Sequence, residues 1–364
     1  MKNYDHNNLK NLTIVLPTYE RQNYLIRFLN YWSDKKVQII AMDGSKRSLH
    51  YDIIKNLSKN IKYFHLPKSY YQRMFEAIDL IETEFVMQAC DDEFYIPSAL
   101  NSSIKKLIKN PDLVTCGGNC MGFDYVKGSV IGFKRYEKLK NLRLFISDPN
   151  ERIKKHFSNY VPAHIYSISR SKIWKIASKT VYSKEYSFFG ALELQLEFLL
   201  LYGGKTLILP ELMWLRSGEN KSIHNNTPSF APINTFRKWW LGDKYLNEKQ
   251  DFIFRMEQAC KQIDRANHLN NKPIIKDIFK KYLYFNKHGY LGLTWPFVEP
   301  FLRYTPSLKK LLKIFYNILI NRNLSKKNLS EMAEEYLSDN IKVDFNELGI
   351  IKNKIINFHR KKKF

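Results

Sequence analysis

Short apolar runs alternate with segments of helical periodicity through the N-terminal part of the chain, and this alternation constrains the fold more than any other feature. The expected strands are 12–17, 37–43, 61–66 and 84–89, and the expected helices are 22–33, 52–60 and 70–82. Strands and helices that alternate at this spacing form parallel pairs, because each helix returns the chain to the same edge of the sheet. The sequence therefore predicts an α/β protein with a Rossmann-like, mostly parallel sheet sandwiched by helices. In such sheets ligands bind beyond the carboxyl ends of the strands.

The second half of the chain is organised differently. Residues 117–190 are less regular, and they precede an expected helix over 192–202 and a strand over 206–209 that Pro210 ends. Residues 235–364 hold 26 Lys plus Arg against 13 Asp plus Glu, and their apolar residues have helical spacing. We therefore divide the chain into a domain over 1–234 and a basic, mainly helical region over 235–364.

Charge and cysteine content limit the class of protein. The formal net charge of +24 attracts nucleic acid, nucleotide phosphates or an anionic membrane surface. Cys116 and Cys120 have the spacing of half a zinc site, but no matching Cys or His pair exists, so small apolar thiols are the favoured interpretation. The N-terminus lacks the apolar segment of a secretory signal, and no run of about 18 apolar residues is present. These features indicate a protein of a reducing compartment, the cytoplasm.

A cluster of three carboxylates follows the expected strand over 84–89. Asp91, Asp92 and Glu93 would repel one another at the end of an apolar strand unless a cation lay between them. Hard oxygen ligands suit Mg²⁺ or Mn²⁺, which commonly bridge one or two carboxylates to substrate phosphates. The alternative is a solvated turn with a helix cap.

Three motifs in order carry a resemblance to a known family. Leu-Pro-Thr-Tyr-Glu-Arg stands at 16–21, Asp-Gly-Ser at 43–45, and the carboxylate cluster follows at 91–93. Over residues 12–215 this resembles the family 2 nucleotide-sugar glycosyltransferases of the GT-A fold. The resemblance implies transfer of a sugar from a nucleotide-diphosphate-sugar donor to a hydroxyl of a glycan or lipid-linked glycan. It also implies an inverting mechanism and a Mg²⁺ or Mn²⁺ cofactor.

The same resemblance implies roles for individual residues. The residues expected to border the donor are Pro17, Thr18, Glu20, Arg21, Asp43, Arg73 and Asp91. Asp43 would accept the N3–H of a uracil or thymine ring, which favours a UDP-sugar. Asp92 would be the first metal ligand, and Asp91 or Glu93 would replace a carboxylate of the family that is Cys90 here.

A second stretch, residues 190–211, supplies the expected general base. Aligning Gly204 and Pro210 with the family places the base at Glu193, with Glu197, four residues on, as the competing residue. A carboxylate at this place would take the proton of the acceptor hydroxyl. The alternative is that both are ordinary exposed helix acids. Further on, the resemblance implies that Arg216 binds the diphosphate and that His224 completes the metal shell; a surface histidine is the alternative.

The basic C-terminal region has three interpretations. It is a solvated appendage, a membrane-surface anchor formed by the amphipathic stretch 308–320 and the basic tail, or a nucleic-acid-binding region. The resemblance favours the second, which places the protein in the cytoplasm with a peripheral contact on the cytoplasmic face of the inner membrane. No nucleic-acid-binding motif is recognisable, so no nucleic-acid partner is expected. The rival hypotheses are a basic nucleic-acid-binding protein and a transferase-like fold without activity, because Cys90 and Leu192 replace acids of the family.

Overall fold

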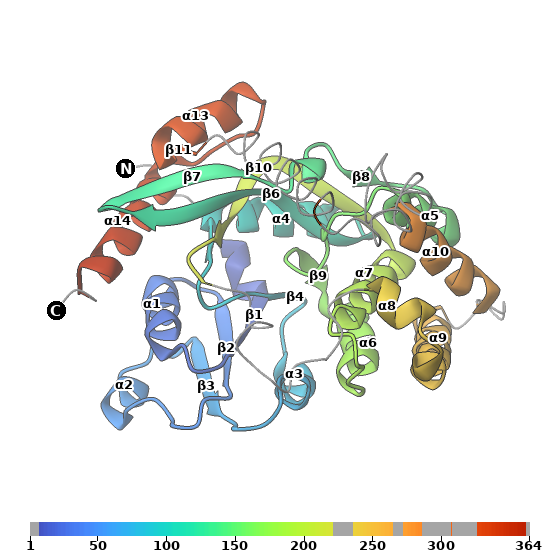
Figure 1. Cartoon of the computed structure of the whole chain (residues 1–364). Helices are drawn as coiled ribbons and strands as arrows, with labels where there is room; N and C mark the ends of the chain where they lie inside the picture. The colour runs from blue at the N-terminus through green and yellow to red at the C-terminus, as the bar shows by residue number, and fades with distance from the viewer. Residues whose placement is uncertain (1–6, 221–235, 265–271, 286–306, 308–325, 362–364) are drawn as a thin grey trace.

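The parallel half of the sheet comes first in the chain. The computed structural model describes residues 7–220, 236–264, 272–285, 307 and 326–361. The first strands are β1 (Leu12–Thr18), β2 (Gln38–Asp43), β3 (Ile61–His65) and β4 (Phe85–Gln88). They lie in the order β3-β2-β1-β4, and each neighbouring pair is parallel (Figure 1). The four expected strands are confirmed, and their carboxyl ends lie at one edge of the sheet.

Beyond β4 the sheet is mixed. It continues with β9 (Ile168–Arg170), β6 (Leu113–Val126), β7 (Ser129–Arg135) and β10 (Lys205–Ser217). β6 pairs in parallel with β10 and antiparallel with both β9 and β7. Lys127 and Gly128 join β6 to β7 with φ values of 49° and 87°. A two-residue turn in which both φ values are positive is typical of an antiparallel hairpin. The α/β class is confirmed, with parallel pairing concentrated in the N-terminal strands.

Helices cover both faces of the sheet. One face packs against α1 (Gln22–Trp32), α4 (Pro97–Lys109), α13 (Leu329–Ser338) and α14 (Phe345–Lys361). The other packs against α3 (Tyr70–Ala77), α5 (Pro149–Ser158), α6 (Ser171–Tyr182), α7 (Ala191–Gly203), α9 (Leu246–Ile263) and α10 (Lys272–Phe285). Alternation along β1 explains the two layers, because Ile14 and Leu16 enter the first core and Val15 the second. The expected sandwich is therefore present (Figure 1).

Several expected boundaries differ from those in the structure. The expected helix over 52–60 is only α2 (Tyr51–Lys55), none of whose residues is buried, so no apolar face extends it. α3 ends at Ala77 and continues as a 3₁₀ turn, Ile78–Leu80. β10 continues past Pro210. The pairing register shifts between Ile208 and Leu212, so the proline, which has no N–H to donate, lies where the ladder of hydrogen bonds is already interrupted.

The residues after 235 are built into the same cores. α9 and α10 pack against α5, α6 and α7, and β11 (Lys327–Asn328) adds an antiparallel strand to β7. α14 contacts α1, β6 and β7 (Figure 1). The helical character expected of this region holds for its described residues, while the amphipathic stretch 308–320 lies outside them. None of the described helices combines the length and apolar character that a membrane span requires.

Candidate active site

The carboxyl ends of β1, β2 and β4 bring the sequence-predicted residues together. Thr18 pairs with Asp43 across β1 and β2, and the chain leaving β4 carries Asp91 to the same edge. Thr18 donates its hydroxyl to Asp91 Oδ2 at 2.6 Å, and Asp91 is fully buried. The parallel pairing thus places an ionisable carboxyl inside the protein at the strand ends.

Arg21 bridges the first two carboxylates of the cluster. Its guanidinium lies 2.9 Å from Asp91 Oδ1 and 3.0 Å from Asp92 Oδ2. Burial opposes the charge of Arg21, but the two carboxylates outweigh it and raise the arginine pKa. Burial raises the pKa of Asp91 to about 7 despite Arg21, and the neighbouring charge of Asp92 adds to the shift.

The turn after β1 is held by contacts of its own. Glu20 has a φ of 54°, a left-handed conformation that a non-glycine residue adopts at a cost of about 1 kcal/mol. The turn is stabilised because Glu20 N–H donates to Ser45 Oγ and Lys46 N–H donates to Glu20 Oε1, each at 2.8 Å. These contacts join the ends of β1 and β2, and Pro17 lies half-buried inside β1.

Asp43 lies at the same edge of the sheet, and both Asp43 and Arg73 make protein contacts. The buried carboxylate of Asp43 accepts from Ser45 N–H at 2.8 Å, from the Tyr63 hydroxyl at 2.8 Å and from Gln22 Nε2 at 3.2 Å. Arg73 donates to the carbonyl oxygens of Thr18 and Met42 at 2.7 and 2.5 Å. A Cβ on Gly44 would lie 2.5 Å from the Arg73 guanidinium, so only glycine leaves room for this clamp. Burial lowers the pKa of Arg73.

Asp92 is the most exposed carboxylate of the cluster. It is 8% exposed, compared with 0% for Asp91 and 4% for Glu93. Besides Arg21, Asp92 Oδ2 accepts from Asn220 Nδ2 at 2.8 Å, and the Asp92 carbonyl accepts from Arg27 at 2.8 Å. Among the described residues, both side-chain donors to Asp92 reach Oδ2, which leaves Oδ1 as the cluster's best ligand atom for an added cation.

Glu93 is held in an aromatic environment. Its Oε2 accepts from Trp214 Nε1 at 2.8 Å and from the Tyr95 hydroxyl at 3.1 Å, and Arg216 Nε lies 3.8 Å from Oε1. Burial raises the pKa of Glu93 to about 8, although Arg216 opposes the shift.

This raised pKa predicts a pH dependence of stability. Between the ordinary value of 4.5 and about 8 the folded chain binds the Glu93 proton more tightly than the unfolded chain, so stability falls as the pH rises through that window. Glu93→Gln should remove this part of the loss, up to about 5 kcal/mol at pH 9, because its Oε1 still accepts from Trp214 and Tyr95. Melting temperatures from pH 5 to 9 measure it, with exposed Glu334→Gln as the control. Parallel curves for wild type and Glu93→Gln would contradict the assignment.

Arg216 links the cluster to the expected base. It lies over the rings of Tyr136 and Tyr166 at 5.2 and 5.6 Å, and Tyr136 accepts a hydrogen bond from it. Glu193 is half-buried near the start of α7 and accepts from the Tyr160 hydroxyl. Burial raises the pKa of Glu193 to about 6; the Tyr160 hydrogen bond and the charge of Arg216 act against that shift, while the charge of Glu197 adds to it. A carboxyl group with this pKa can exchange a proton near neutral pH.

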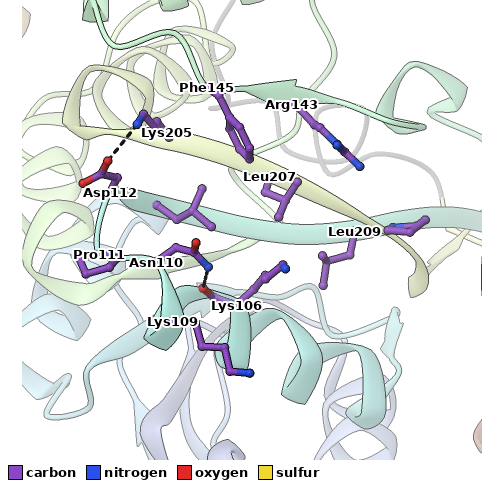
Figure 2. A pocket seen from close by; sticks show the side chains of 12 residues that line it. Lys106, Lys109, Asn110, Pro111, Asp112, Arg143, Phe145, Lys205, Leu207 and Leu209 are labelled. Atoms are coloured by element: carbon purple, nitrogen blue, oxygen red, sulfur yellow. Dashed lines mark hydrogen bonds and ion pairs between the residues drawn. The ribbon is translucent and has the colours of Figure 1, made fainter.

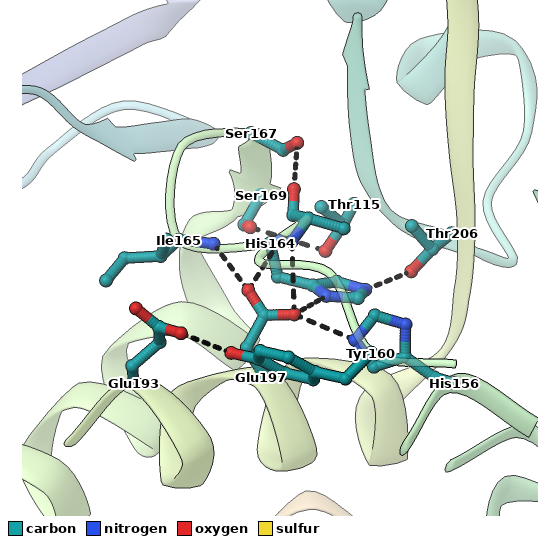
Figure 3. Close-up of polar contacts among 11 residues, drawn as sticks. Thr115, His156, Tyr160, His164, Ile165, Ser167, Ser169, Glu193, Glu197 and Thr206 are labelled. Atoms are coloured by element: carbon teal, nitrogen blue, oxygen red, sulfur yellow. Dashed lines mark hydrogen bonds and ion pairs between the residues drawn. The ribbon is translucent and has the colours of Figure 1, made fainter. Parts of the chain in front are cut away.

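Glu197, the competing base, is fully occupied by protein donors (Figure 3). Oε1 accepts the N–H groups of His164 and Ile165 at 2.7 and 3.1 Å. Oε2 accepts from His164 Nδ1 at 2.5 Å, from His156 Nε2 at 3.1 Å and from Ala163 N–H at 3.3 Å. Burial alone would raise the pKa of Glu197, but the two histidines hold it well below its ordinary value. The geometry makes Glu197 an anchor for the loop that carries Tyr160 and Tyr166.

Among the described residues, one group of three potential metal ligands is compact enough to surround an ion. Its members are His156, His164 and Glu197. Asp91, Asp92 and Glu93 do not converge in that way, so together they do not form a three-carboxylate cage. A cation at their edge would take few ligands from the protein and the others from substrate or water, as Mg²⁺ commonly does. His224, expected in the metal shell, lies outside the described residues.

α14 contributes to this site a histidine that the sequence did not predict there. His359 Nε2 lies 2.6 Å from Glu219 Oε1, and its ring stacks on Tyr125 at 4.2 Å. Glu219 in turn lies 3.8 Å from Arg27, which binds the Asp92 carbonyl. A histidine near a basic terminus has no local signal of such a role, because its partners are more than 100 residues away in the sequence.

Comparison with known proteins gives distant structural matches alone. No family model and no curated protein matches the chain. Residues 1–349 of S. aureus TarS in complex with UDP-GlcNAc match with a TM-score of 0.44 at 14% identity, over 74% of this chain and 88% of that one. The same TarS residues in complex with UDP match with a TM-score of 0.41 at 13% identity, over 74% of this chain and 87% of that one. Identities this low do not transfer residue roles.

Proposed function

We propose that the chain transfers a sugar from a nucleotide-diphosphate-sugar to a hydroxyl of a glycan. The observation that carries the proposal is the placement of Arg216, which contacts Glu93 and also acts on the pKa of Glu193. The guanidinium of Arg216 is therefore within electrostatic reach of both the carboxylate cluster and a carboxyl group whose pKa is about 6. Transfer from a diphosphate donor needs both functions side by side: stabilisation of the departing anion and removal of the acceptor proton.

The donor diphosphate would lie against Arg21 and Arg216. Both arginine side chains are partly exposed, at 21% and 28%, so each can add a phosphate contact to its existing partners. Asp43 remains our proposed acceptor for the base, with UDP as the favoured nucleotide. A base N–H would replace Gln22, whose 3.2 Å contact is the longest of the three.

A divalent cation is the second part of the proposal. Asp92 fits a site in which Mg²⁺ or Mn²⁺ takes one carboxylate from the protein, because it is the most exposed of the three and the described side-chain donors reach its Oδ2 and not its Oδ1. Bound there, the cation would neutralise charge on the diphosphate as it leaves.

The proposed reaction is a single displacement with inversion. The acceptor oxygen forms a bond to the anomeric carbon, the bond from that carbon to the diphosphate oxygen breaks, and its electron pair leaves with the nucleoside diphosphate. The acceptor proton passes to Glu193, whose carboxyl is oriented by the Tyr160 hydroxyl. Arg216 balances the charge of the diphosphate, and the half-buried aromatic rings of Tyr136 and Tyr166 strengthen that interaction by limiting the access of water.

The acceptor is proposed to be a glycan or lipid-linked glycan reached from the cytoplasmic side of a membrane. The basic composition of the C-terminal region supports a peripheral contact with anionic lipid. Co-sedimentation with phosphatidylglycerol vesicles tests this contact separately from catalysis. A lack of co-sedimentation at low salt would refute the proposed membrane contact.

Nucleotide binding tests the donor site. We expect one nucleoside diphosphate to raise the melting temperature, and more so with Mn²⁺, because a ligand at a hundredfold excess over its Kd stabilises the native state by about 2.7 kcal/mol. Asp92→Asn should abolish the Mn²⁺-dependent part, whereas Asp79→Asn, an exposed control with 73% side-chain accessibility, should not. If a nucleotide raises the melting temperature equally with and without Mn²⁺, the proposed metal site is refuted and the proposed donor site stands. No shift with any nucleotide would refute the donor site.

A further inference from the structure

A cavity of about 580 Å³ lies away from the proposed active site. It is lined by residues from the C-terminal end of α4, the starts of β6 and β10, and the neighbourhood of β8 (Arg143–Leu144). Arg216 lies nine residues beyond Leu207 on β10, which corresponds to about 30 Å along an extended strand. The cavity is therefore at the opposite end of these strands from the carboxylate cluster.

Positively charged side chains from separate elements line this cavity (Figure 2). Lys106 and Lys109 come from the last turn of α4, Arg143 from β8 and Lys205 from β10. Lys205 is paired with Asp112 at 2.9 Å, and this is the single acidic residue among the lining residues. Within the described part of the chain, Lys106, Lys109 and Arg143 form no ion pair, which leaves three uncompensated cations around one cavity.

An aromatic side chain completes the lining. Phe145 is 48% exposed and projects into the cavity beside Leu207 (Figure 2). The dipole of α4 accounts for two lysines in its last turn, because cations stabilise the C-terminal end of a helix. It does not account for Arg143, which comes from another element, or for an exposed phenyl ring next to it.

We propose that this cavity binds a small organic phosphate, with the phosphate on the Lys106 and Arg143 side chains and the organic part on Phe145. A guanidinium forms paired hydrogen bonds to phosphate oxygens, and an ammonium group adds a point charge that suits the same anion. The phenyl ring offers an apolar surface that inorganic phosphate cannot use. This site is independent of the proposed transferase reaction, because it shares no residue with the donor site.

Titration with phenyl phosphate and with inorganic phosphate, followed by calorimetry on the full chain, tests the proposal. We expect Lys106→Ala/Arg143→Ala to bind phenyl phosphate about tenfold more weakly, because it loses charged hydrogen bonds. The matched control Lys138→Ala/Lys172→Ala removes two exposed cations elsewhere and should bind like the wild type. All four side chains are exposed, so the variants retain the fold.

Three further measurements identify the organic part of the ligand, the place where it binds and the source of the phosphate. Phe145→Ala should weaken phenyl phosphate binding and leave inorganic phosphate unchanged, and Arg216→Ala should leave phenyl phosphate binding at this cavity intact. If phosphatidylglycerol vesicles bind the wild type and do not bind Lys106→Ala/Arg143→Ala, the phosphate that this cavity binds is that of a lipid headgroup. Equal binding by Lys106→Ala/Arg143→Ala and its control would overturn the proposal. Loss of phenyl phosphate binding in Arg216→Ala would also overturn it, since the anion would then occupy the donor site.

Discussion

Glu193→Gln is expected to lower kcat for sugar transfer by about 10²- to 10⁴-fold, which is the usual contribution of a general base. The amide keeps the size of the side chain and can still accept from the Tyr160 hydroxyl, but it cannot take a proton. Because Glu193 is proposed to act on the acceptor hydroxyl, nucleotide affinity should remain unchanged. Release of nucleoside diphosphate from the donor measures kcat, and calorimetry measures affinity.

The pH profile separates this role from a structural one. A base must be deprotonated, and the pKa of Glu193 is about 6, so kcat should fall as the pH drops through about 6 and level off above it. Glu193→Gln should lose that inflection in its residual rate. Wild-type turnover by Glu193→Gln, or an unchanged inflection near pH 6, would exclude Glu193 as the base.

Glu197→Gln is expected to lower the free energy of unfolding by about 3–5 kcal/mol, because removing one partner from a buried charged network leaves the others uncompensated. The carboxylate accepts from both imidazoles and from three backbone N–H groups, whereas an amide would turn an N–H₂ group toward some of these donors. Urea unfolding followed by circular dichroism measures the change. Exposed Glu334→Gln is the control.

The lowered pKa of Glu197 fixes the sign of its pH dependence. A carboxyl whose folded pKa is depressed stabilises the protein above its ordinary pKa of 4.5, and this stability is lost as the pH falls through the folded value. The difference between wild type and Glu197→Gln should therefore shrink below pH 4.5. A variant as stable as the wild type at pH 7 would show that the network contributes little.

The sequence was most informative where local periodicity and strand order determine position. The apolar runs predict β1 to β4, and parallel pairing then places Thr18, Asp43 and Asp91 at one edge of the sheet. That part of the site depends only on where each strand ends. The roles proposed for these residues remain predictions that the geometry accommodates.

Long-range contacts were not predictable in the same way. The helical spacing of Glu193 and Glu197 cannot show that the loop 163–165 binds one of them through its backbone and leaves the other half-buried. Arg73 was expected to border the donor, yet its guanidinium bridges the carbonyl oxygens of two strands. His359 reaches Glu219 through the packing of α14 on β6 and β7, which no local pattern encodes.

Turnover of nucleotide sugars by the purified chain tests the central claim most directly. A panel of nucleotide-diphosphate-sugars with Mn²⁺, with glycan acceptors or with water as the acceptor, is assayed for release of the nucleoside diphosphate. We predict release from one class of donor, strongly reduced in Glu193→Gln and in Asp92→Asn and retained in Asp79→Asn. Release that is equal in all of these variants, or no release from a donor that calorimetry shows to be bound, would contradict the proposed transferase.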